Sequence, residues 1–153
     1  MQLTEQERST IKYLQTQEKS CAEKYTRYSD EANDPVLKSL FKELAEKEQK
    51  HYSSLEQVLQ GHVPDCNCND SDGRSYSPTA TYDSLNQTPE MKSDCFLATD
   101  CISSEKLISS EYNSDVFAFQ DSDIRKLLAD IQVEEQNHAE MLYKYKMVNG
   151  MAS

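Results

Sequence analysis

Two of the three histidines in the chain follow a glutamate by three residues, as Glu48 with His51 and Glu135 with His138. Positions three apart share one face of a helix, so each pair would present a carboxylate and an imidazole to the same point. One such pair is a weak signal in a chain with 27 acidic residues, since a charged helix face is usually solvated. Two pairs indicate a metal site if the fold brings them together.

Two further glutamates, Glu18 and Glu105, lie thirty residues before the two pairs. Buried glutamate is almost always paired or bound, and four buried carboxylates would repel one another without cations or protons. Two single glutamates plus two Glu-x-x-His pairs form the ligand set of di-iron and di-manganese carboxylate bundles. Such oxygen-rich ligands suit iron or manganese better than zinc. We therefore predict a site for two Fe or Mn ions, with the ligands Glu18, Glu48, His51, Glu105, Glu135 and His138.

Four helices are predicted to position these residues. Apolar residues recur at steps of three and four, the spacing of one helix face. Asp34 and Asp121 suit helix N-caps, and Gly61 suits a helix end. Only three Gly and four Pro occur in the chain, which favours an all-α fold. The four stripes run over residues 11–32, 37–58, 97–119 and 124–145.

The second helical hairpin repeats the first with a displacement of 87 residues. Nine of 38 aligned positions are identical, where chance would give about two or three. In each hairpin the two glutamates lie fifteen residues either side of the turn, and therefore at the same level. A long segment without periodicity joins the hairpins, as in ferritin-like bundles with one crossover connection. We predict one ferritin-like four-helix domain over 1–153, with hairpin 1 at about 4–61, a crossover loop at about 62–92 and hairpin 2 at about 93–150.

Four other residues near the predicted site have open roles. Glu111 is an alternative to Glu105, but it lies about 120° off the stripe and breaks the repeat. Tyr25 and Tyr112 lie seven residues after Glu18 and Glu105. They would either hydrogen-bond to ligand carboxylates, act as a radical sink, or be ordinary core tyrosines. Cys21 follows Glu18 by three residues and would either approach one metal ion or serve as a small core hydrophobe.

The cysteines form no regular framework. Their odd number, five, is typical of a reducing compartment. No Cys-x-x-Cys occurs, which excludes a rubredoxin-type iron centre within this sequence. Cys66 and Cys68 lie near His62, where they would bind a soft metal, form cross-links or stay free. Cys95 and Cys101 receive no assignment.

Charge and hydropathy restrict the partners. A formal net charge of −11 argues against nucleic acid and anionic membranes, because both require a basic face. No stretch approaches the roughly 18 apolar residues of a membrane span. The first residues lack the basic and apolar regions of a secretory signal. We therefore expect synthesis in the cytosol, without nucleic-acid or membrane partners.

Several phrases resemble the coat-F family of bacterial spore coat proteins. They are QEKSCAEKY (17–25), LFKELAEKEQKH (40–51), TDCISSEKLISSEY (99–112), DIQVEEQNHAEMLYKY (130–145) and NGM (149–151). The resemblance covers both hairpins and implies a ferritin-like bundle, a sporulating bacterium and deposition in the spore coat. It also implies self-association or contact with other coat proteins. By analogy with ferritin-like sites, Glu18 and Glu105 would be terminal ligands, Glu48 and Glu135 would bridge, and each histidine would bind one ion.

The sequence thus predicts a spore-coat-type ferritin-like protein with a di-metal carboxylate site. Such a site is suited to chemistry with dioxygen or peroxide, as a di-iron oxidase or peroxidase or as a dimanganese catalase. The alternatives are a structural coat component without turnover and an iron-storage protein. Neither the metal nor the presence of turnover follows from the residues.

Overall fold

The computed structural model describes residues 2–65 and 71–151, and every regular element in those ranges is a helix. The four long helices are α1 (Glu5–Glu31), α2 (Pro35–Leu59), α4 (Pro89–Asp115) and α5 (Ser122–Val148). Two short elements accompany them, α3 (Asp72–Ser75) in the crossover connection and the 3-10 turn η1 (Val116–Ala118) after α4. The predicted all-α bundle is confirmed. None of the described helices has the length and apolar content that crossing a bilayer requires.

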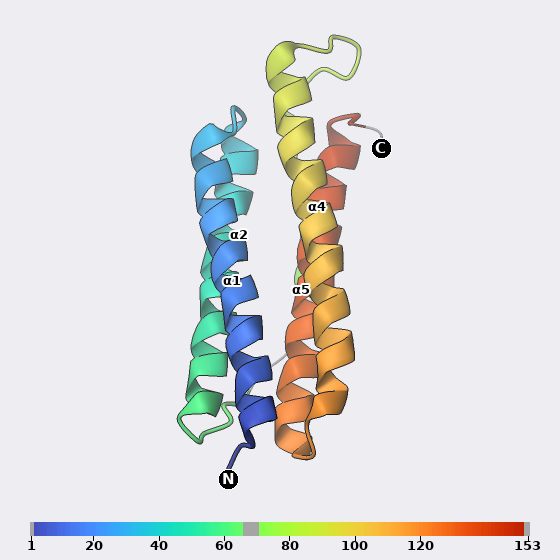
Figure 1. Cartoon of the computed structure of the whole chain (residues 1–153). Helices are drawn as coiled ribbons and strands as arrows, with labels where there is room; N and C mark the ends of the chain where they lie inside the picture. Colours follow the sequence, from blue (N-terminus) through green and yellow to red (C-terminus); the bar gives the residue numbers. More distant parts are fainter. Residues whose placement is uncertain (1, 66–70, 152–153) are drawn as a thin grey trace.

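The long helices pack as two antiparallel hairpins. Helix α1 lies against α2, and α4 lies against α5 (Figure 1). The hairpins meet where α1 contacts α4 and α2 contacts α5. The short helix α3 of the crossover connection packs on α5.

Local sequence signals fix where the helices begin and end. Each long helix starts at a residue whose side chain accepts a hydrogen bond from the first turn. Helices α2 and α5 are each followed by a glycine in the left-handed region, Gly61 with φ of 94° and Gly150 with φ of 68°. The expected roles of Asp34, Asp121 and Gly61 are therefore confirmed. The four N-caps are Thr4, Asp34, Thr88 and Asp121.

Helix α4 begins earlier than the residue near 93 expected from the apolar spacing. Thr88 accepts a hydrogen bond from the Met91 backbone, and Pro89 occupies the first helical position. The next inward-facing residue is Asp94, which is fully buried. Asp94 occupies the core position between Met91 and Leu97, so the continuous apolar spacing begins only at Leu97, about two turns after the start of the helix.

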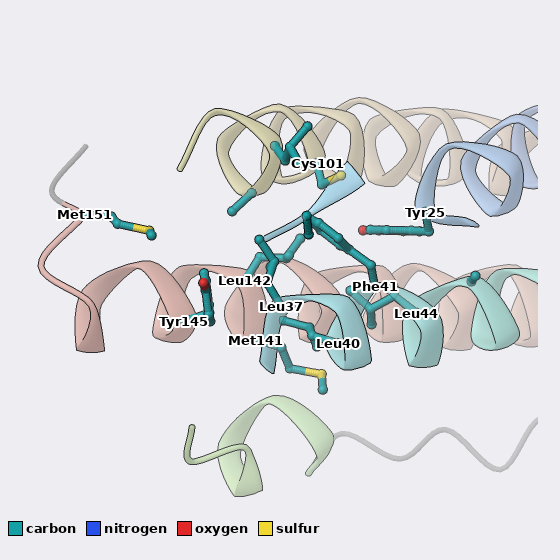
Figure 2. Close-up of a cluster of buried hydrophobic side chains, with 14 of the residues drawn as sticks. Tyr25, Leu37, Leu40, Phe41, Leu44, Cys101, Met141, Leu142, Tyr145 and Met151 are labelled. Carbon is teal, nitrogen blue, oxygen red and sulfur yellow. The ribbon is translucent and has the colours of Figure 1, made fainter. Parts of the chain in front are cut away.

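The core consists of two apolar clusters separated along the bundle. One contains Tyr25 of α1, Phe41 of α2, Cys101 of α4 and Leu142 of α5, together with their neighbours (Figure 2). The other surrounds Leu14 and Ile131 towards the opposite end. In every long helix the predicted ligand positions fall between the residues of the two clusters. The fold therefore places one polar layer inside an otherwise apolar interior.

Candidate metal centre

The polar layer contains the six residues that the sequence analysis selected. Every long helix contributes at least one of them, and none is more than 3 % exposed. Helices α1 and α4 each supply one glutamate, whereas α2 and α5 each supply a Glu-x-x-His pair. The residues are Glu18, Glu48, His51, Glu105, Glu135 and His138.

Within the described residues these side chains form two overlapping groups with metal-ligand geometry. In each group, one ligand atom from every residue lies within 4.8 Å of the others. Glu48 and Glu135 belong to both groups, so they are the residues that two ions would share. The first group adds Glu18 and His51, and the second adds Glu105 and His138.

The two imidazoles face the carboxylates through Nδ1. Nδ1 of His51 lies 2.8 Å from Oε1 of Glu135 and 3.5 Å from Oε2 of Glu18. Nδ1 of His138 lies 2.7 Å from Oε1 of Glu48 and 3.5 Å from Oε1 of Glu105. The rings are stacked with centroids 5.9 Å apart. On its Nδ1 side, each histidine is therefore nearest to the shared glutamate of the opposite hairpin.

Eight ligand atoms in this layer are buried without a hydrogen-bond partner. Even the close contacts between Nδ1 and the carboxylates lack hydrogen-bond geometry. Burying polar atoms without partners is costly, and burying charges is costlier. A pair of divalent cations would satisfy all of these atoms, so the donor set fits a di-metal centre. The atoms are Oε2 of Glu18 and Glu105, both oxygens of Glu48 and Glu135, and Nδ1 of His51 and His138.

A comparison of the sequence with models of protein families agrees with this di-metal interpretation. The family model described as Rubrerythrin matches residues 10–146, nearly the whole chain. The chain belongs to the rubrerythrin family. Searches of curated proteins and of solved structures gave no significant match. Membership supports the ferritin-like di-iron carboxylate group, whereas the resemblance to the coat-F family is not confirmed.

The electrostatics of this rubrerythrin-family site divide the four carboxylates into two kinds. Burial disfavours the charged form of Glu18 and Glu105, but a neighbouring histidine and hydrogen bonds outweigh it, so the pKa of each is lowered. Burial and then the negative charge of the other carboxylates raise the pKa of Glu48 and Glu135 well above the usual value. Without a cation, Glu48 and Glu135 are therefore the carboxylates of the layer that take up protons most readily.

The two tyrosines reach the site across the hairpins. The Tyr25 hydroxyl of α1 donates to Oε1 of Glu105 at 2.6 Å, and the Tyr112 hydroxyl of α4 donates to Oε1 of Glu18 at 2.5 Å. Burial and the adjacent carboxylate raise the pKa of both phenols, which therefore stay protonated donors. Hydrogen-bond partners of this kind orient the ligand carboxylates that they contact.

Other residues considered for the site lie outside the two ligand groups. Glu111 is only half-buried, whereas Glu105 is inside the layer. Cys21 is half-buried, and burial and then the nearby carboxylates raise the pKa of its thiol. Cys95 is half-buried and Cys101 is buried, and both are free thiols. Cys66 and Cys68 fall outside the described residues.

Sequence reasoning missed Glu134. Its Oε2 makes a short contact with Nε2 of His51, on the side of the ring away from the carboxylates. The residue directly precedes Glu135, and consecutive residues on a helix point about 100° apart. It therefore lies off the inward stripe, and only the position of α2 beside α5 reveals its contact with His51.

Proposed function

We propose that this chain holds two iron or manganese ions in the polar layer and uses them in a reaction with peroxide or dioxygen. The observation that carries the proposal is the set of eight buried ligand atoms without hydrogen-bond partners, arranged in two groups that share Glu48 and Glu135. Bound Fe(II) or Mn(II) would supply electrons and activate bound oxygen species.

The protein's own contribution is positioning and exclusion of water. Tyr25 and Tyr112 hold one oxygen of Glu105 and Glu18, leaving the second oxygen of each for an ion. The apolar clusters on both sides exclude water from the layer. A ligand set contributed by all four helices also fits a purely structural role, in which the ions join the two hairpins without turnover.

The two roles differ in whether peroxide or dioxygen is consumed. The metal-free chain is loaded anaerobically with Fe(II) or Mn(II), bound metal per chain is measured, and oxygen or peroxide is then added. The catalytic role predicts two ions per chain and consumption that His51→Ala abolishes. Glu46→Gln, which changes an exposed residue of α2, serves as the control. Equal rates in the wild type and His51→Ala would contradict catalysis and leave the structural role.

A spore-coat location, with self-association or other coat proteins as partners, is a separate proposal that rests on the phrases resembling the coat-F family. Its test is fractionation of spores from the native host, with an antibody against this chain. Recovery in the coat extract would support the proposal, and recovery only from vegetative cells would reject it.

A further inference from the structure

The His51 ring is held from both of its nitrogens. Nδ1 faces the carboxylate layer, and Nε2 makes its short contact with Oε2 of Glu134. The imidazole is buried, whereas the Glu134 side chain retains 21 % exposure at the junction of α5 and α2. Glu134 therefore connects a predicted ligand to the rim of the bundle.

This contact has a chemical consequence for metal binding. An imidazole that binds a cation through Nδ1 carries its proton on Nε2, which then needs an acceptor. A carboxylate in that place fixes the tautomer and the ring orientation and makes the nitrogen a better ligand. Glu134 supplies this acceptor to His51 from the opposite hairpin.

His138 has no equivalent support. The repeat of 87 residues places Lys47 where the second hairpin has Glu134. A lysine ammonium only donates hydrogen bonds, so it cannot accept the proton of an imidazole. Lys47 instead forms an ion pair with Asp72 of α3, at 3.6 Å. Among residues 2–65 and 71–151, no hydrogen bond is formed by Nε2 of His138.

We propose that Glu134 is a positioning residue for His51 and makes the two halves of the site unequal. The half with Glu18 and His51 then binds its ion more tightly than the half with Glu105 and His138. The inequality rests on the proposed function, since it requires that both halves bind metal. It arises because the duplicated pattern keeps all six ligands but replaces the supporting carboxylate of one half with lysine.

The test uses Co(II), a divalent probe that is stable in air, with the metal-free full-length chain. Titration of the wild type should give two separate dissociation constants. Glu134→Gln and Glu134→Ala should weaken the tighter constant roughly 10–100-fold and leave the looser one nearly unchanged. Glu134→Gln keeps the shape of the side chain, and circular dichroism verifies its fold. Glu46→Gln removes one carboxylate charge from the exposed face of α2 and should change neither constant.

A gain of affinity provides the converse test. Lys47→Glu gives His138 an acceptor and should tighten the looser constant. Lys50→Glu makes the same change of charge at an exposed position of α2 and should not tighten it selectively.

Proton NMR of the Co(II) protein reports which histidine is occupied. One equivalent of Co(II) should shift a single exchangeable imidazole N–H signal in the wild type and two partial signals in Glu134→Ala. The inequality would be overturned if the wild type had two equal dissociation constants for Co(II), or if Glu134→Gln and Glu134→Ala left both constants unchanged. Either result would leave the di-metal site intact. Failure of the wild type to bind any Co(II), Fe(II) or Mn(II) would overturn the proposed function as well.

Discussion

Each glutamate outside the Glu-x-x-His pairs has its two oxygens in different surroundings. Oε1 of Glu18 accepts the Tyr112 hydroxyl and Oε1 of Glu105 accepts the Tyr25 hydroxyl, whereas both Oε2 atoms have no hydrogen-bond partner. Hydrogen bonds to a charged acceptor contribute about 1.5–3 kcal/mol each. The tyrosines therefore keep these carboxylates charged and direct the free oxygen into the layer.

Removing one of these hydroxyls should weaken metal binding in one half. Tyr112→Phe deletes the hydrogen bond to Glu18 but keeps the buried ring, so we expect roughly 10-fold weaker binding of one of two ions. Calorimetric titration with Mn(II) measures both constants. Tyr13→Phe, at a residue that is 46 % exposed, is the matched control. Unchanged constants in Tyr112→Phe would show that the phenol is only a core tyrosine.

The shared glutamates should make opposite contributions with and without metal. Glu48→Gln removes a ligand and should abolish binding of the second ion. In the metal-free protein at neutral pH the same change should raise the melting temperature by about 2–4 °C for each kcal/mol gained. The reason is that the pKa of Glu48 is raised by burial and by Glu18, so the native state otherwise has to protonate this carboxyl. A metal-free Glu48→Gln protein that melts below the wild type would contradict this.

Residue spacing predicted all six members of the layer because each interrupts an apolar stripe at a position repeated in the second hairpin. The contacts of Tyr25, Tyr112 and Glu134 were beyond such reasoning. Each of these side chains meets a residue of the opposite hairpin, and the sequence pattern within one hairpin holds no information on how the two hairpins face each other.

At the scale of the elements, a buried polar network fastens the hairpins at one end. Asp94 of α4 accepts hydrogen bonds from the backbone amides of Asn33 and Asp34, between α1 and α2, and from the Tyr82 hydroxyl. Asp34 accepts from the Tyr145 hydroxyl of α5 at 2.6 Å. One network thus joins the α1–α2 turn, the crossover connection and the second hairpin.

A single substitution in this network should cause a large loss in the free energy of unfolding. Asp94→Ala would leave two backbone amides and a phenol without their acceptor, which we expect to cost about 2–4 kcal/mol. The melting temperature should fall by roughly 5–15 °C. Asp83→Ala is the control, because this exposed aspartate caps only the Leu85 amide. Equal melting temperatures for the two variants would mean that water replaces the buried acceptor.

Asp94 of this network also bears on which helices, and which helix ends, could be predicted from the sequence. Helices α1, α2 and α5 follow from continuous apolar stripes with good caps. The first turn of α4, before residue 93, was missed because the inward-facing Asp94 is polar and interrupts the apolar spacing between Met91 and Leu97. Thr88 and Pro89 form an N-cap signal in the sequence, but no continuous apolar stripe follows them directly. The short helix α3 has too few residues to show any periodicity.

At the scale of the whole molecule, the polar layer makes the free energy of folding depend on pH and on cation binding. Four of the six predicted ligands have raised pKa values in the metal-free protein. Burial and neighbouring carboxylates raise those of Glu48 and Glu135, and for His51 and His138 the nearby carboxylates outweigh burial. Folding without metal therefore takes up protons in the layer. Metal binding needs the same groups deprotonated, so it releases those protons.

The sign of the resulting pH dependence differs between the two states. A group with a raised pKa contributes stability that is complete below its unfolded pKa and lost as pH rises through the folded one. The lowered pKa values of Glu18 and Glu105 matter only below about pH 4–5. Between about pH 5 and 8 the metal-free protein should therefore become less stable as pH rises.

Melting curves in chelator and in excess Mn(II) over that pH range measure both states. The melting temperature in chelator should fall with rising pH, and the gain from Mn(II) should grow, because fewer protons then compete for the ligands. Glu48→Gln/Glu135→Gln, which removes two of the four raised groups, should reduce the slope in chelator and lose the gain from Mn(II). A gain that is constant with pH would mean that the cation binds elsewhere, at surface carboxylates that are already ionised. The layer would then fold with its protons in place, and the acidic core would be a structural feature independent of metal.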